Sequence, residues 1–127
     1  TTRLVGSEMC IRDRGKRNLR LRKYRELLPR FLEAKALAFS SDYNAIEAIN
    51  FFFDEGIMVP EQISVTGYDD SVYASMIRPK LTTVHQDIPQ KAHVALERLM
   101  KLIQGETLNE LNIKNPVYLV KRDSVKE

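Results

Sequence analysis

The sequence predicts an α/β fold: an incomplete three-layer arrangement with a parallel sheet and helices on both of its faces. Short apolar, β-branched runs alternate with longer stretches of helical periodicity over residues 35–121. Strands that are separated by helices pair in parallel, and the connecting helices cover the sheet. A chain of 127 residues is long enough for one domain or for part of one.

The first fourteen residues are set apart from this pattern. Residues 4–14, LVGSEMCIRDR, resemble a translated sequencing-library adapter, so we interpret residues 1–14 as a non-native leader. The single cysteine, Cys10, lies within them, which excludes an internal disulfide framework and a cysteine-based zinc site. We therefore begin the fold prediction at Gly15 and expect the native N-terminus to be missing.

Residues 15–34 form a basic segment with the spacing of a helix. Residues 15–30 contain seven Lys and Arg side chains against the lone Glu26, whereas the net charge from residue 31 onward is −4. Pro29 is expected to kink this helix or to start a second one. We favour a solvated basic helix over a nucleic-acid-binding arm, because no groove-reading pattern accompanies the charges.

Residues 35–56 predict a strand followed by a helix. The apolar run from Lys35 ends in serines at Ser41, and Asp42 can cap a helix over residues 43–55 that Gly56 terminates. The apolar arc of this helix is wider than one sheet face needs. Either the helix is deeply buried, or its second face contacts another chain.

The remaining elements follow in the same alternation. A buried strand over residues 59–67 is expected to break at Gly67, just before Asp69 and Asp70. Asp87 and Gln90 form a capping-box variant at the start of the fourth predicted helix. The expected elements after Gly67 are a short helix over residues 71–77, a strand over 81–84, a helix over 88–104 and a strand over 117–121.

Three predicted strands end in polar groups, at Ser41-Asp42, at Asp69-Asp70 and at His85-Gln86. The carboxyl ends of parallel strands share one edge of a sheet, where ligands bind. Carboxylates, hydroxyls and an amide suit a neutral polyhydroxylated ligand and repel anions, and no Gly-rich phosphate loop is present. From the residues alone, Asp69 and Asp70 are candidates both for a ligand contact and for a cap of the following turn or helix; with the family resemblance described below, we assign Asp69 to the ligand contact and Asp70 to the cap.

Two other site types are weaker. Asp42 and Asp69 could act as a carboxylate pair with His85 as a base, but no nucleophile motif accompanies them. The same residues with Asp70 have metal-ligand chemistry but no metal-ligand spacing. We expect no enzyme, no metal and no cofactor. The sequence has no membrane-spanning run and no secretory leader, so the expected location is cytoplasmic.

Four ordered blocks resemble the LacI/GalR family of transcriptional repressors over about residues 35–124. These blocks are LAFSSDYNAIEAINFFFDEG, VPEQISVTGYDD, LTTVHQ and LVKRDS. The resemblance implies the C-terminal part of a type I periplasmic-binding-protein-like domain, whose effector, a sugar or sugar derivative, lies between two subdomains. It also implies an operator-reading helix-turn-helix and a first subdomain, neither of which is in this sequence.

The resemblance assigns roles to individual residues. Asp69 matches the effector-binding aspartate of Gly-Tyr-Asp, Asp42 matches the aspartate of the Asn-Asp turn, and Gln86 matches the glutamine of Thr-Thr-x-x-Gln. Ser41 stands where the family often has an effector-contacting asparagine. Arg20 resembles an effector-binding arginine, but the interval to Ser41 lacks a strand and a helix, so either a deletion joined two pieces or the likeness is coincidental.

The resemblance further implies a homodimer. Its interface would explain the wide apolar arc, and it would use Ile46, Phe51, Tyr73, Met76 and Ile77. Two alternatives stay open: a sugar-binding transport protein with the same core, and a fragment without an independent function.

Overall fold

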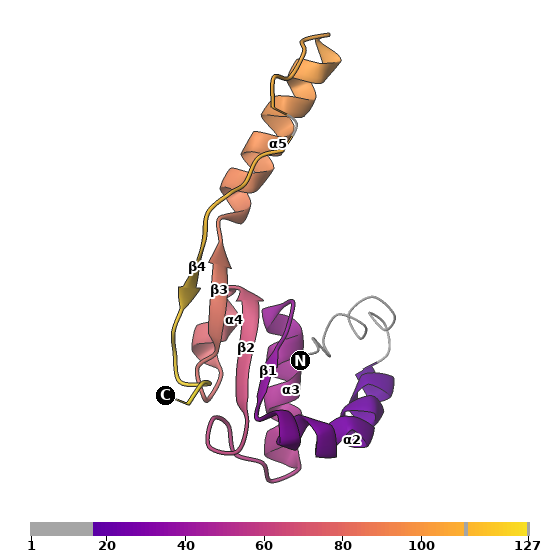
Figure 1. Ribbon diagram of the computed structural model, residues 1–127, viewed down its shortest axis with the longest axis vertical. Coiled ribbons are helices and arrows are strands. Elements are labelled where there is room, and N and C mark those ends of the chain that lie inside the picture. The colour runs from indigo at the N-terminus through magenta and orange to yellow at the C-terminus, as the bar shows by residue number, and fades with distance from the viewer. Residues whose placement is uncertain (1–16, 111, 127) are drawn as a thin grey trace.

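The computed structural model describes residues 17–110 and 112–126 and shows a four-stranded sheet with helices (Figure 1). The predicted leader, residues 1–14, lies outside the described residues. The sheet order is β1-β2-β3-β4. Along the chain the elements are α2 (Arg17–Ala34), β1 (Ala36–Ala38), α3 (Asp42–Asp54), β2 (Ser64–Asp69), α4 (Val72–Met76), β3 (Thr82–Gln86), α5 (Ile88–Ile103) and β4 (Val117–Val120).

The fold class is confirmed as α/β with a mostly parallel sheet, and the fourth strand departs from the parallel prediction. Strands β1, β2 and β3 pair in parallel, with Leu37 opposite Val65 and Thr66 opposite Thr82. Strand β4 pairs antiparallel with β3, so that Thr83 lies opposite Val120. The reason is visible in Figure 1: α5 leaves the sheet end-on instead of crossing back over a face, and the chain returns alongside β3.

Helix α5 is also an exception to the prediction that helices cover the sheet. The predicted N-cap is confirmed, because the Asp87 carboxylate accepts a hydrogen bond from Gln90 N at 2.9 Å. However, α5 contains no buried residue, and Leu96, Leu99 and Ile103 are exposed. Its apolar face is therefore unpartnered within the part of the chain that the structure describes. None of the described helices is long and apolar enough to cross a membrane.

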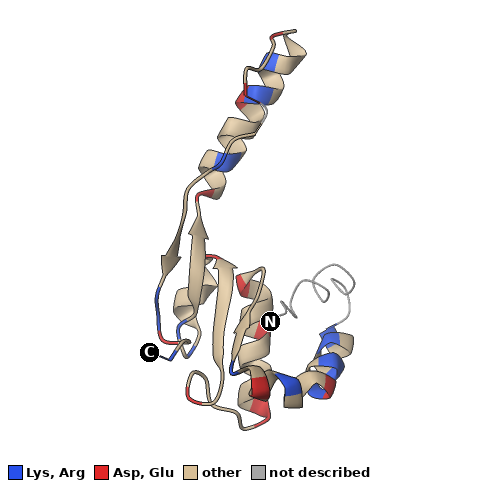
Figure 2. Ribbon diagram, in the orientation of Figure 1, with Lys and Arg blue, Asp and Glu red and all other residues tan. Residues whose placement is uncertain are grey.

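The basic segment is a single helix that passes through Pro29, and its expected solvated state is wrong for one of its faces. Figure 2 shows Lys and Arg spread along α2, yet Tyr24 and Phe31 of this helix are only 1% and 2% exposed. The Tyr24 ring packs 5.6 Å from that of Phe51, and the Phe31 ring packs 6.2 Å from that of Phe52. Helix α2 thus covers the second apolar face of α3. This explains why the apolar arc of α3 is wider than one sheet face needs.

Strand β2 does not break at Gly67 as predicted but continues to Asp69. A Cβ atom at position 67 would lie 2.3 Å from Asp42 Oδ1 and 2.8 Å from Leu81 Cδ2. This glycine therefore allows close packing within a strand and does not end it. The core around β2 is formed by Ile63, Val65 and Leu81, each fully buried, together with Ala45, Phe52 and Ala74.

Candidate functional site

The parallel pairing of β1, β2 and β3 brings the three predicted polar strand ends to one edge of the sheet. Ser41 and Asp42 follow β1, Asp69 ends β2, and Gln86 ends β3. Asp69 pairs in register with His85. The residues therefore meet as the strand-end argument predicts.

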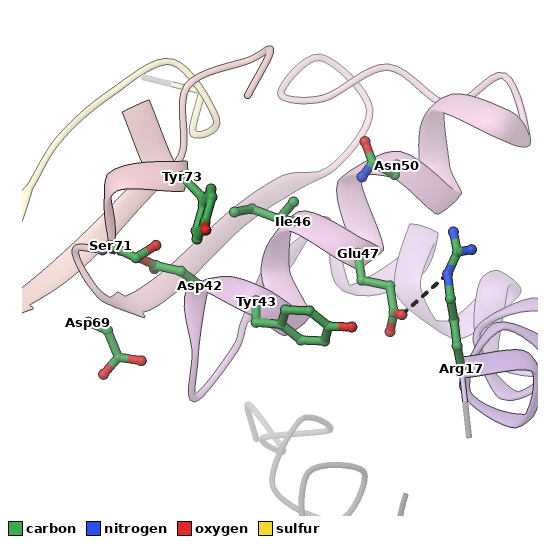
Figure 3. A pocket seen from close by; sticks show the side chains of 9 residues that line it. All are labelled: Arg17, Asp42, Tyr43, Ile46, Glu47, Asn50, Asp69, Ser71 and Tyr73. Atoms are coloured by element: carbon green, nitrogen blue, oxygen red, sulfur yellow. Dashed lines mark hydrogen bonds and ion pairs between the residues drawn. The ribbon is translucent and has the colours of Figure 1, made fainter. Parts of the chain in front are cut away.

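A cavity of about 650 Å³ opens at this edge (Figure 3). Asp42 and Asp69 line it, whereas Ser41 and Gln86 do not, although Gln86 contacts Asp69. Sequence reasoning missed Tyr43, Glu47, Asn50 and Arg17, because periodicity shows which face of a helix is apolar but not which polar residues face a cavity. The lining residues are Arg17, Asp42, Tyr43, Ile46, Glu47, Asn50, Asp69, Ser71 and Tyr73.

Asp69 is the cavity carboxylate with the most unusual backbone. Its φ is +116°, in the left-handed half of conformational space that residues other than glycine rarely adopt. Its Oδ1 accepts a hydrogen bond from Gln86 Nε2 at 2.6 Å. A carboxylate has about four lone-pair sites, so Asp69 keeps capacity to accept from ligand hydroxyls.

Asp42 is held by hydrogen bonds within the chain. Its Oδ2 accepts from Ser71 N at 2.6 Å and its Oδ1 accepts from the Thr83 hydroxyl at 2.5 Å, while the side chain is 1% exposed. These contacts join the start of α3 to β3 and to the start of α4. They favour a positioning role for Asp42, and its contact with a ligand stays a prediction.

Two predicted helix caps are corrected. Ser41, not Asp42, is the N-cap of α3, since the Ser41 Oγ accepts from Asn44 N at 3.4 Å and from Asn44 Nδ2 at 3.0 Å. The N-cap residue of α4 is Ser71, not Asp70. Asp42 is instead the first helical residue of α3, and its carboxylate turns toward the sheet.

Asp70 forms an ion-pair cluster in place of a cap. Its Oδ1 accepts from Arg122 Nη2 at 2.5 Å, and its Oδ2 lies 2.9 Å from His85 Nδ1. Burial would raise the pKa of Asp70, but the hydrogen bonds with Arg122 and His85 outweigh it and hold that pKa below its ordinary value. Arg122 is the arginine of the LVKRDS block that resembles the family, but no spacing in the sequence linked it to Asp70.

Arg20 lies buried beside the cavity and pairs with Glu47, one of the residues that line it. Arg20 Nε and Nη2 donate to the two carboxylate oxygens of Glu47 at 2.7 and 3.0 Å, and both side chains are 7% exposed. The hydrogen bond with Glu47 raises the pKa of Arg20. This pair fixes α2 against α3 at the cavity wall.

The predicted dimer residues fall into three groups: exposed, buried and half-buried. Tyr73 and Met76 are 66% and 67% exposed, whereas Phe51 is 3% exposed and packs on Tyr24. Phe51 is therefore a core residue, and its assignment to an interface is wrong for this structure. Ile46 and Ile77 are half-buried, and both pack against the core.

The chain matches a known family of domains. The periplasmic binding protein-like domain family matches residues 4–125. The chain belongs to this family. Within it, the chain is a segment of the effector domain of LacI/GalR-type regulators, as the relatives show.

Relatives of known sequence or structure support the assignment. The HTH-type transcriptional regulator GalR of Escherichia coli (strain K12) is 39% identical over 101 residues, which cover 79% of this chain and 29% of GalR. The transcriptional regulator CelR–cellobiose complex gives a TM-score of 0.74 at 31% identity and covers 82% of this chain and 32% of that chain. The lac repressor dimer bound to operator and the anti-inducer ONPF gives 0.71 at 31% identity, covering 83% and 36%.

The LacI/GalR prediction is thus confirmed at the level of the family. The relatives are transcriptional regulators and not enzymes, in agreement with the prediction that this chain is no enzyme. The chain spans less than a third of the length of GalR. No group of three or more side chains suited to a metal ion occurs among residues 17–110 and 112–126.

Proposed function

We propose that this chain is the effector-sensing part of a cytoplasmic LacI/GalR-type repressor, and that its effector is a sugar or sugar derivative. The observation that carries the proposal is Asp69, a cavity carboxylate whose strained backbone is fixed beside Gln86 at the end of β2. A titratable acceptor held in a rare conformation at a cavity is typical of a ligand-binding position. CelR, a relative by structure, is described in complex with cellobiose.

The cavity chemistry supports a hydroxyl-rich, uncharged ligand. Among the described residues that line it, the carboxylates are Asp42, Glu47 and Asp69 and the cation is Arg17, whose Nε lies 3.7 Å from Glu47 Oε1. Tyr43 adds an aromatic surface that can pack against a sugar ring. Anionic ligands would meet net negative charge, so a sugar phosphate is disfavoured.

In the proposed repressor, this chain supplies one wall of the effector cleft and part of a homodimer interface. Effector binding would shift the equilibrium between two arrangements of the subdomains and so change operator affinity. Operator binding would belong to a helix-turn-helix outside this sequence. The exposed apolar face of α5 is the surface on which the other subdomain would pack.

The complete coding sequence tests this proposal. We expect an in-frame helix-turn-helix upstream of Gly15, and a secretory leader in its place would favour a transport protein. The full-length protein should bind neutral mono- or disaccharides such as cellobiose in calorimetric titrations and should not bind glucose 6-phosphate. Tight binding of the phosphate, with no binding of neutral sugars, would contradict the proposed ligand class.

A further inference from the structure

Two consecutive aspartates at the end of β2 have positive φ angles: Asp69, the last residue of the strand, at +116°, and Asp70, which follows it, at +50°. Neither is a glycine, and a sparsely populated backbone conformation costs free energy at each of them. Such a turn persists only where surrounding contacts hold it. The contacts that hold it therefore also set the direction of the Asp69 carboxylate.

Each aspartate is held by the neighbouring strand. Asp69 accepts from Gln86, and Asp70 lies 2.9 Å from His85, the residue before Gln86 on β3. The His85 ring stacks on Tyr118 of β4, with centroids 4.7 Å apart and an interplanar angle of 23°. The end of β2 is thus attached to the β3–β4 ribbon at two adjacent positions.

The second partner of Asp70 comes from the C-terminal segment. Arg122 donates to Asp70 at 2.5 Å and to the Leu81 carbonyl at 2.8 Å, and its backbone N–H donates to the Thr82 hydroxyl at 2.9 Å. The Asp70 and Arg122 side chains are 17% and 18% exposed, so water screens their pair only partly. Arg122 is therefore a fixed donor with three anchors.

Ser124 holds this segment independently of Asp70. Its hydroxyl donates to the Val65 carbonyl at 2.6 Å and accepts from Thr82 N at 2.8 Å, and its carbonyl accepts from Val65 N at 2.8 Å. The side chain is fully buried between β2 and β3. The contacts of Ser124 thus hold the C-terminal segment in place, and Arg122 lies next to the Asp69–Asp70 turn even without its bond to Asp70.

We propose that Arg122 and His85 are positioning residues that act through Asp70 to aim the Asp69 carboxylate into the cavity. The proposal rests on the proposed function in one respect, namely that Asp69 is the ligand contact. Without the Asp70 contacts, the Asp69–Asp70 turn relaxes toward ordinary extended backbone. The Asp69 carboxylate then leaves Gln86 and the cavity, and ligand affinity falls although no ligand-contacting side chain has changed.

Nuclear magnetic resonance of the isotopically labelled full-length protein tests the positioning without any ligand. In Arg122→Gln we expect the Asp69 backbone amide and the Gln86 side-chain amide to leave their wild-type positions, and Arg122→Lys should restore them in part. Arg25→Gln is the matched control, since it removes the Arg25–Glu55 ion pair of 2.6 Å at a distant surface. It should leave both signals unmoved.

His85→Ala provides a second variant that retains the Arg122–Asp70 pair. It should move the same two signals in the same direction by less. Unmoved signals in folded Arg122→Gln overturn the proposal. If Arg122→Gln does not fold, unmoved signals in His85→Ala overturn it equally.

Calorimetric titration of the full-length protein with cellobiose and other neutral sugars separates the two proposals. A sugar that Asp69→Asn no longer binds should bind Arg122→Gln at least tenfold more weakly than wild type, with Arg25→Gln unchanged. Wild-type affinity in Arg122→Gln overturns the positioning role and leaves the proposed function intact. If no form binds any sugar, the proposed function fails, while the resonance shifts still decide the positioning role.

Discussion

Gly67→Ala tests the packing at the centre of the site. The new Cβ would lie 2.3 Å from Asp42 Oδ1, a separation that demands movement of one of the two groups. Asp42 cannot move freely, because Ser71 N and the Thr83 hydroxyl hold its two oxygens. Overpacking costs about 1–3 kcal/mol, and loss of a hydrogen bond to a charged group costs about 1.5–3 kcal/mol. We therefore expect the free energy of unfolding to fall by roughly 3–5 kcal/mol.

Urea unfolding monitored by far-ultraviolet circular dichroism measures this loss. A double-mutant cycle identifies its cause: in the Asp42→Ala background the clashing oxygen is gone and only the 2.8 Å approach to Leu81 Cδ2 remains, so Gly67→Ala should cost less than it does alone. Gly56→Ala is the control, because no atom lies within 4 Å of its new Cβ and only the strain of a φ of +73° remains. Equal costs of Gly67→Ala in both backgrounds would refute the proposed contact.

Three further predictions use other parts of the structure. Arg20→Ala should lower the free energy of unfolding by up to about 3–5 kcal/mol, because buried Glu47 would keep only its longer contact of 3.7 Å with the exposed Arg17. Arg25→Ala, at a side chain 66% exposed, should cost less than about 1 kcal/mol in the same urea assay. The pKa of Asp70 is lowered in the fold, so its contribution to the free energy of unfolding is complete above about pH 4 and is lost as the pH falls through the pKa of the folded state. In Asp70→Asn, the free energy of unfolding should therefore fall less between pH 5 and pH 3 than it does in the wild type. In the 127-residue chain, Leu99→Ser on exposed α5 should change the free energy of unfolding by less than about 0.5 kcal/mol, while Leu81→Ala in the core should cost about 2–5 kcal/mol. A large loss for Leu99→Ser would show that α5 packs on the rest of this chain.

Local sequence patterns predicted most of the helices and strands, and also which residues lie at the sheet edge that carries the site. The alternation of apolar runs set the order of strands and helices, and the parallel connection of β1 to β3 was enough to bring Asp42, Asp69 and Gln86 together. The Asp87 cap was equally local, because its acceptor and donor lie three residues apart. These features depend on short-range spacing and on one rule of sheet topology.

The features that the sequence did not predict depend on residues that are distant from each other in the chain. The periodicity of α3 showed an apolar arc too wide for one sheet, but not that Tyr24 and Phe31 of α2 would cover Phe51 and Phe52. Glycine after a β-branched run suggested a break, whereas the reason for Gly67 is a carboxylate 25 residues earlier in the chain. The Asp70–Arg122 pair spans 52 residues and has no signature of its own.

The antiparallel β4 was missed for a related reason. A strand that follows a helix is expected to be parallel when the helix crosses a sheet face. Here α5 has no buried residue and extends away from the sheet, so the chain returns along β3 in the opposite direction. The amphipathic sequence of α5 indicated a buried face, but not that this face would have no partner among the described residues.

The inducer response of the full-length protein with Asp69→Ala is the most direct test of the central claim, that the end of β2 contacts the effector. Loss of a hydrogen bond to a charged acceptor, about 1.5–3 kcal/mol, corresponds to roughly 10- to 150-fold weaker effector binding. In a reporter assay Asp69→Ala should therefore still repress but no longer respond to the sugar, while Asp54→Ala, at an exposed residue on α3, should respond as wild type. A normal response from Asp69→Ala would contradict the claim.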